Sequence, residues 1–286
     1  MGYQSRRKRS AVKRAAVAIL LLGIITLAGM CHVATSAPVV RSTAVNVEAL
    51  AAPVRLILLS DIHVAGPDMP PSRLKRIVAQ INALRPDVIV IAGDFISDKR
   101  IATRRYSAEE AIAPLTGLRA RLGIVAVLGN HDHWRDAAAI SVQLKRARIH
   151  ILENDAARIG PLTIGGVDDP FTQHDDLART IQRMRSLPPS RILVSHSPDI
   201  FPKVPADVAL TLAGHTHCGQ IRLPLMGALS TMSAYGERYA CGRLDEKGRT
   251  LITSAGLGTS LIPLRLGAAP DVWLVNLQPQ AAGERL

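Results

Sequence analysis

Nearly continuous apolar runs of strand length recur along the chain from residue 54, and each ends at a polar residue. The first run covers 54–59, and similar runs cover 88–92, 124–128, 192–194 and 208–213. Continuous rather than alternating apolar residues are typical of strands that are buried on both faces. Two further runs, 251–253 and 272–275, predict closing strands near the C-terminus.

Four segments between these runs carry apolar residues at helical spacing. The first begins at Ser72, a favourable capping residue, and Pro86 lies just beyond its end. The others cover 108–122, 134–147 and 175–184. Strands that alternate with helices predict an α/β architecture, in which ligands bind beyond the carboxyl ends of the strands.

The N-terminus has a different pattern, with a basic flank at 1–14 followed by an apolar segment at 15–31. Seventeen residues are the lower limit for a helix that spans a membrane. We therefore expect a transmembrane signal anchor at 15–31, a linker at 32–52 and one domain at 53–286. The basic flank should stay in the cytoplasm, which would place the domain on the other side of the membrane.

Cleavage of this N-terminal segment is a weaker alternative. Thr35-Ser36-Ala37 has the form of a cleavage site, but Pro38 follows it unfavourably. The segment 27–31 approaches a lipoprotein box but has the wrong spacing, and 5–7 resembles a twin-arginine signal without the apolar residues that normally follow. Whether the anchor is removed stays open at this point.

The amino-acid composition restricts the possible functions less than the pattern of apolar and polar residues does. The 286 residues, 48% of them hydrophobic, are enough for a large core. The net charge is +12, but six positive charges lie within 1–14, and the moderately basic remainder suits an anionic substrate or lipid headgroup as well as nucleic acid. We expect no specific nucleic-acid partner, and the sequence leaves the oligomeric state open.

The chain has three cysteines, Cys31, Cys218 and Cys241, which do not form a disulfide framework. Cys218 and Cys241 would pair in an oxidising compartment, but two free thiols are equally compatible with the sequence.

Five polar segments that follow predicted strands carry the candidate chemistry. They are Asp61-Ile62-His63, Gly93-Asp94, Gly129-Asn130-His131-Asp132, Ser195-His196 and Gly214-His215-Thr216-His217. Each alone is more often a turn or a helix cap. Together they supply carboxylates, imidazoles and one amide at a shared sheet edge, which is ligand chemistry for two metal ions.

In this order the five segments resemble the calcineurin-like metallophosphoesterase superfamily, over about 54–276. The phrases at 212–220 and 254–259 are similar to a bacterial branch with an N-terminal membrane or export segment. That branch includes phosphodiesterases and enzymes that cleave the diphosphate of a UDP-linked diacylglucosamine. The resemblance implies a four-layer αββα sandwich with two central mixed sheets.

The resemblance also implies a role for each matching residue. Asp61, His63 and His217 would bind one metal, Asn130, His196 and His215 the other, and Asp94 would bridge both. His131 matches the catalytic histidine, and Asp132 is a candidate partner that orients it. The metals would be two divalent ions, with Mn, Zn and Fe all compatible with these ligands.

These roles predict a phosphoester hydrolase in which a metal-bridging hydroxide attacks phosphorus in line. A diester or pyrophosphate is a better expected substrate than a monoester. The anchor, the basic domain and the apolar segment 223–229 favour a lipid-linked substrate, although that segment would also suit the core. The alternatives are a hydrolase of soluble nucleotides or small phosphodiesters, and a non-catalytic scaffold stabilised by metal. Asp98 is either an ordinary loop acid or a support for the site.

Overall fold

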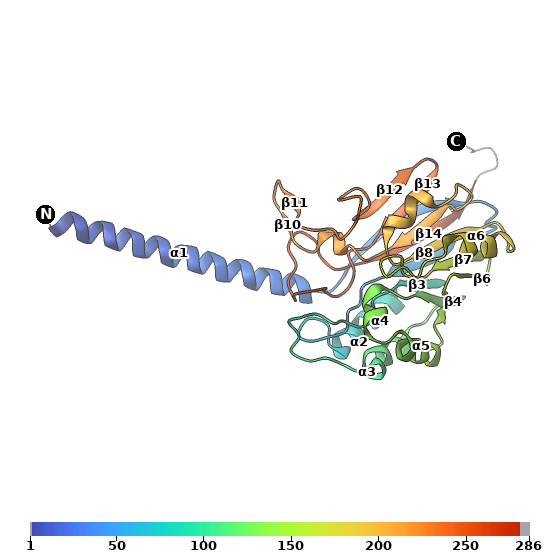
Figure 1. Cartoon of the computed structure of the whole chain (residues 1–286), viewed down its shortest axis with the longest axis horizontal. Helices are drawn as coiled ribbons and strands as arrows, with labels where there is room; N and C mark the ends of the chain where they lie inside the picture. The colour runs from blue at the N-terminus through green and yellow to red at the C-terminus, as the bar shows by residue number, and fades with distance from the viewer. Residues whose placement is uncertain (1, 281–286) are drawn as a thin grey trace.

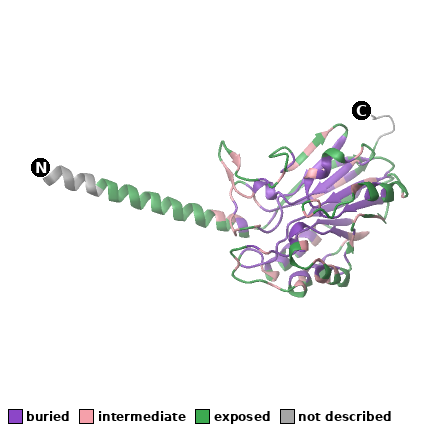
Figure 2. Cartoon of the chain, viewed as in Figure 1, coloured by how far each residue is buried: buried purple, intermediate pink, exposed green. Residues whose placement is uncertain are grey.

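The N-terminal helix projects from a domain that is built on two β-sheets. The computed structural model describes residues 2–280, and the helix, α1 (Gly2–Thr35), extends away from the domain on one side (Figure 1). Its segment Ala11–Thr35 is long and apolar enough to cross a membrane. Residues 11–29 of this segment are exposed, whereas Ala34 near its end is buried against the domain (Figure 2). The last residues of the expected domain, 281–286, lie outside the described part of the chain.

The first sheet has six strands, and its inner four supply most of the apolar runs. In spatial order they are β1 (Val39–Val47), β14 (Asp271–Pro279), β2 (Val54–Leu59), β3 (Val88–Ala92), β4 (Gly123–Val127) and β5 (His150–Ile151). Strands β2 to β5 run parallel, and β14 pairs antiparallel with β2.

The second sheet also has six strands and is also mixed. In spatial order they are β12 (Gly242–Glu246), β13 (Arg249–Thr253), β9 (Leu210–Ala213), β8 (Arg191–Ser195), β7 (Leu162–Val167) and β6 (Asp155–Ile159). The central four strands run parallel, and the two edge strands are antiparallel to their neighbours.

Helices cover the outer face of each sheet, which completes the expected four layers. Over the first sheet lie α2 (Pro71–Ala83), α3 (Ala108–Ile112), η1 (Ala113–Gly117) and α5 (Ala137–Arg146), with α4 (Asn130–Arg135) at its end. Over the second lie α6 (Leu177–Arg185) and η2 (Pro198–Lys203). A short turn, η3 (His217–Gly219), and a hairpin of β10 (Arg222–Leu223) and β11 (Gly227–Ala228) follow β9. The predicted α/β fold with two mixed sheets is confirmed.

The continuous apolar runs are explained by burial on both faces. In β2, Ile57 and Leu59 pack under the helices, whereas Leu56 and Leu58 pack against the second sheet. Figure 2 shows both sheets buried in the centre of the domain. Each of these strands therefore lacks a solvent-facing side on which polar residues would alternate.

Residues 32–52 differ from the expected linker because they contain β1. This strand pairs with β14 over its whole length, and Val45 and Val47 are buried in the core between the sheets. Arg41 forms an ion pair with Asp271, with 2.7 Å between Nε and Oδ2. Only three residues, 36–38, separate α1 from β1, so α1 is joined almost directly to the sheet.

Two predicted helices are interrupted in the structure. The segment 108–122 becomes α3 followed by η1, where Pro114 lies in the first turn. The segment 134–147 is divided at Asp136, whose side chain accepts a hydrogen bond from the amide of Ala139 and caps α5. Proline and capping chemistry therefore shortened both helices relative to their apolar patterns.

Candidate metal centre

The backbone turns sharply at the ends of the strands that carry the candidate ligands. Five of these residues have left-handed φ values between 48° and 70°: Asp61, His63, Asp94, His215 and His217. Residues other than glycine rarely adopt this conformation, and such residues cluster at functional sites. The turns direct carboxylates and imidazoles from both sheets into one buried region.

Two glycines allow the chain segments to approach closely around the site. Gly93 has a φ of +81°, and a Cβ there would lie 2.7 Å from the amide nitrogen of Gly129 and 2.8 Å from Nδ1 of His196. Gly256 has a φ of +74°, and a Cβ there would lie 2.5 Å from Cβ of Asp61. A larger residue at either position would displace a candidate ligand.

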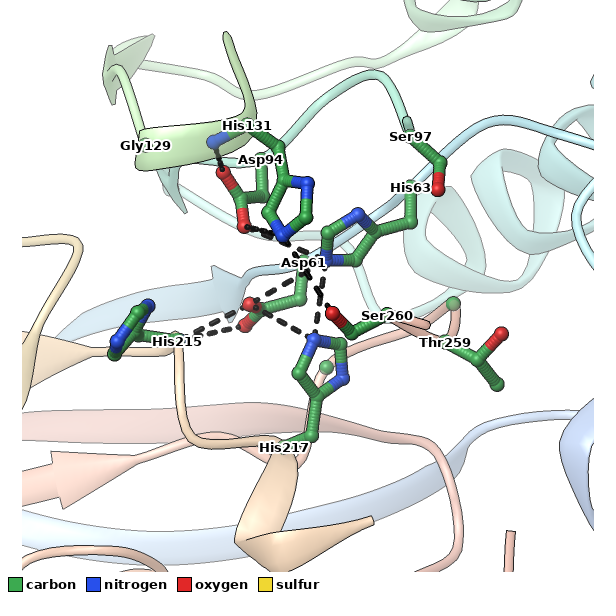
Figure 3. A network of polar contacts seen from close by, with 12 residues as sticks. Asp61, His63, Asp94, Ser97, Gly129, His131, His215, His217, Thr259 and Ser260 are labelled. Carbon is green, nitrogen blue, oxygen red and sulfur yellow. Dashed lines mark hydrogen bonds and ion pairs between the residues drawn. The ribbon is translucent and has the colours of Figure 1, made fainter. Parts of the chain in front are cut away.

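Asp61, His63 and His217 lie together and form the first group of candidate metal ligands. Nε2 of His63 lies 3.0 Å from Nε2 of His217, and Oδ1 of Asp61 lies 3.4 Å from Nε2 of His217. The amide of His215 donates to both carboxylate oxygens of Asp61 at 3.0 Å. Figure 3 shows the two imidazoles and the carboxylate directed toward one another.

Asn130, His196 and His215 form the second group. Oδ1 of Asn130 lies 3.1 Å from Nε2 of His196 and 2.9 Å from Nδ1 of His215. Nδ1 of His196 lies 2.7 Å from the carbonyl oxygen of Ala92, which can only accept a hydrogen bond. Nδ1 therefore carries a proton, and Nε2 is directed toward Asn130 and Asp94.

Asp94 lies between the two groups. Its Oδ2 is 3.4 Å from Nε2 of His63 and 3.2 Å from Nε2 of His196. Its Oδ1 accepts a hydrogen bond from the backbone amide of His131 at 2.9 Å. One carboxylate thus reaches both ligand groups, which is the position expected of a bridging residue.

The donor set fits divalent metal ions. Ligands bound at ~2.1 Å to one ion lie ~2.9–3.4 Å apart in octahedral or tetrahedral geometry. The nitrogen and oxygen separations within the two groups have these values, except for 3.9 Å between Nε2 of His63 and Oδ1 of Asp61. Two imidazole nitrogens and the carboxylate oxygen of Asp61 thus converge on one point, where a cation could bind.

Burial and neighbouring charge perturb the titration of the site. Burial lowers the pKa of His63 and His217 well below the usual value, and lowers the pKa of His215 to about 3, so these imidazoles are neutral. Burial raises the pKa of Asp61 to about 6, against the opposing charge of His196 and with the added effect of Asp94. Burial also disfavours a charge on His196, but Asp94 raises the pKa of His196 well above its usual value. His63, His215 and His217 therefore offer uncharged ring nitrogens next to the carboxylate of Asp94.

His131 lies beside the ligands, and its orienting partner differs from the expected one. Nδ1 of His131 contacts Oδ1 of Asp98, and Nε2 lies 4.0 Å from Oδ2 of Asp94 and 3.5 Å from the Ser260 hydroxyl. Asp132 is fully buried and instead accepts hydrogen bonds from the amides of Asp94, Phe95 and Gly129. The structure thus gives Asp98 the contact expected of Asp132, whose carboxylate holds the loop of Asp94.

A buried arginine contacts the site, although no sequence motif predicts it. Arg265 is completely buried, and its guanidinium donates to the carbonyl oxygens of Ala255, Gly256 and Ala268. It also lies 3.4 Å from Nδ1 of His217. Its partners are backbone carbonyls brought together by the fold, which explains why sequence reasoning missed it.

Cys218 and Cys241 form a disulfide with 4.6 Å between their Cα atoms. Cys218 directly follows His217, so the cross-link closes the loop 218–241 beside a candidate metal ligand. The alternative of two free thiols is therefore not the one seen. Cys31, in α1, is a free and exposed cysteine.

Comparison with known proteins identifies the family. The model for the calcineurin-like phosphoesterase family matches residues 54–219, which is more than half of the chain, and the chain belongs to this family. A Bacillus subtilis protein named as the uncharacterized metallophosphoesterase YkuE is 30% identical over 232 residues, which are 78% of this chain and 79% of that protein.

A bovine protein named as a transmembrane protein with metallophosphoesterase domain is also similar. It is 29% identical over 298 residues, which are 95% of this chain and 64% of that protein. This chain thus spans under two thirds of the bovine relative, and similarity to animal as well as bacterial proteins does not restrict it to a bacterial branch. A 5′-nucleotidase precursor structure from Thermus thermophilus superimposes with a TM-score of 0.46 and 12% identity, over 78% of this chain and 55% of that chain.

The disulfide should contribute to stability because it restricts the unfolded chain. Replacing both cysteines, Cys218→Ser with Cys241→Ser, should lower the free energy of unfolding by ~3 kcal/mol, as expected for a closed loop of this length. Thermal unfolding followed by circular dichroism would measure the change. Cys31→Ser is the matched control and should leave the unfolding temperature unchanged. Equal stability of the double variant and the parent would contradict the structural role.

Asp98 should position His131. Asp98→Asn keeps the size of the side chain but removes its charge, and we expect turnover to fall ~10–100-fold while the metal content stays constant. Asp207→Asn, which alters a surface carboxylate paired with Arg185, is the control and should have no effect. Unchanged turnover of Asp98→Asn in steady-state assays would rule out the positioning role.

Proposed function

We propose that this chain is a phosphoester hydrolase that uses a dinuclear metal centre. The observation that carries the proposal is the position of Asp94, whose carboxylate lies within 3.4 Å of one ligand group and 3.2 Å of the other. Membership of the calcineurin-like phosphoesterase family supports the same reaction class. The metals would be divalent Mn, Zn or Fe, because all accept carboxylate, amide and imidazole ligands.

The residues divide the work of hydrolysis between them. Two bound cations would lower the pKa of water toward neutrality and neutralise charge on the phosphoryl oxygens. The seven ligands would hold the cations at a fixed separation because both sheets are packed rigidly beneath them. His131, with Asp98 on its Nδ1, presents Nε2 toward the ligands, where it would stabilise or protonate the departing oxygen.

A second set of observations supports a proposed location of the chain in the cell. We propose that α1 anchors the protein in a membrane with the domain on the extracytoplasmic side. The length and apolar character of Ala11–Thr35 support the anchor, and the name of the bovine relative points in the same direction. The Cys218–Cys241 disulfide supports an oxidising compartment.

The substrate that we propose is a phosphodiester or pyrophosphate, linked to lipid. A substrate embedded in the bilayer would be accessible to a domain that is joined to its membrane helix by only a few residues. A moderately basic domain would attract its phosphate groups.

The dinuclear mechanism predicts different effects for two substitutions. Asp94→Asn should lower both metal content and turnover, the latter at least ~100-fold, because it weakens a ligand shared by both ions. His131→Ala should keep the metals and lower turnover by ~10²–10⁴-fold. Elemental analysis and steady-state assays on the purified protein would measure both effects.

Activity should also be lost on chelation and return when metal is restored. Asp207→Asn serves as the control for purification and folding. If the parent protein binds metal but hydrolyses no phosphoester, the alternative of a metal-stabilised scaffold would replace the proposal.

The substrate class can be tested with three compounds on the full chain in vesicles. We expect hydrolysis of bis-p-nitrophenyl phosphate to exceed that of the p-nitrophenyl monoester, and we expect hydrolysis of a lipid-linked diphosphate to exceed both. Release of p-nitrophenol and formation of the lipid phosphate would be measured at equal substrate concentrations, and a soluble nucleotide diphosphate would be assayed beside the three compounds. Exclusive hydrolysis of the monoester would refute the diesterase, and preference for a soluble nucleotide diphosphate would refute the lipid-linked substrate alone.

A further inference from the structure

The loop closed by the disulfide carries exposed apolar side chains that the hydrolytic site does not use. We define the apolar hairpin as residues 221–232. Its exposed members are Leu225, which is fully exposed, and Met226, Leu229 and Met232, which are 75%, 61% and 56% exposed. Its one charged residue is Arg222. An exposed apolar cluster of this kind marks an interaction surface.

Hydrogen bonds connect this hairpin to the membrane helix through a single segment. The amide of Arg265 donates to the carbonyl of Met30 in α1 at 3.2 Å. The amide of Leu266 donates to the carbonyl of Gln220, and the amide of Arg222 donates to the carbonyl of Leu266 at 2.8 Å. Figure 1 shows the β10–β11 hairpin on the side of the domain from which α1 projects.

The point of contact on α1 sets the depth of the hairpin. Met30 lies at the end of the apolar segment 15–31. A helix rises 1.5 Å per residue, so this segment is ~25 Å long and nearly spans a ~30 Å hydrocarbon core. With α1 in a membrane, Met30 therefore lies near the boundary between acyl chains and headgroups. The segment bonded to Met30, and the hairpin bonded to that segment, must lie against the same surface.

The hairpin is held in place at its base. The Cys218–Cys241 disulfide closes the loop that contains it. Glu237 pairs with Arg222 at 2.9 Å and accepts a hydrogen bond from the amide of Ala228 at 2.5 Å. The apolar side chains at the tip are therefore presented by a braced loop, and its one charge is neutralised at the base.

We propose that the apolar hairpin inserts into the lipid leaflet beside α1 and forms a second membrane contact of the domain. A braced loop with apolar side chains at its tip matches the physical requirements for interfacial insertion. Leu261, which is 56% exposed, directly follows Ser260. The amide of Ser260 donates to the side chain of Gln220 next to the hairpin, and its hydroxyl lies 3.5 Å from Nε2 of His131. The two contacts fix the domain on the bilayer with this edge of the metal centre close to the headgroups.

Fluorescence quenching by brominated phospholipids tests the insertion. The full chain is reconstituted in vesicles whose lipids carry bromine on the acyl chains near the headgroup, and Leu225→Trp and Met226→Trp are compared with the parent. Val142→Trp on α5 is the matched control, because Val142 is apolar and 49% exposed but lies on the helical layer of the first sheet. We expect the added emission of the hairpin variants to be quenched at least twofold more than that of the control.

Two outcomes would overturn the proposal. Emission that is no more quenched than in Val142→Trp would show that the hairpin stays outside the lipid. Blue-shifted but unquenched emission would show that protein, such as a second copy of the chain, covers the hairpin instead. Two exposed positions are tested so that misfolding of one variant would not decide the result. Circular dichroism would check the fold of each variant. Because the signal does not require hydrolysis, failure here would leave the proposed catalytic function standing.

Discussion

The packing of the two sheets against each other fixes the distances on which the metal centre depends. Asp61, Asp94 and Asn130 follow strands of the first sheet, whereas the three histidines at 196, 215 and 217 follow strands of the second. The apolar core between the sheets therefore sets the separations of about 3 Å between their ligand atoms. A close-packed interior resists adjustment, so the candidate ligand side chains are held at fixed positions.

This arrangement concentrates unfavourable groups that would not persist alone. Buried carboxylates, neutral imidazoles and five residues in left-handed conformations lie together at one sheet edge. The apolar strands beneath are buried on both faces, and their burial offsets the unfavourable free energy of these groups. The same edge carries the disulfide-closed loop and the segment that bonds to α1, so the proposed membrane contact and the candidate metal ligands lie in one part of the fold.

The sequence predicted the structure most reliably where one physical cause, the burial of a strand on both faces, dominated. Continuous apolar runs predicted β2, β3, β4, β8 and β9, because burial on both faces leaves no other pattern. The sequence did not predict strand β1, because its run 39–47 is partly polar and exposed. Its partner β14 also lies more than 200 residues away in the sequence. Likewise, the sequence favoured Asp132 as the partner of His131 because the two are adjacent, whereas Asp98 is 33 residues away and reaches His131 only in the folded chain.

The order and spacing of polar residues at strand ends thus determined the family resemblance, the ligand candidates and the α/β fold, because each depends on local pattern. The tertiary structure alone decided which carboxylate contacts His131, that Cys218 and Cys241 pair, and that Arg265 lies behind His217. These contacts join residues from separate loops, and their distances depend on how the sheets and loops pack. The periodicity of apolar residues along the chain carries no information about that packing.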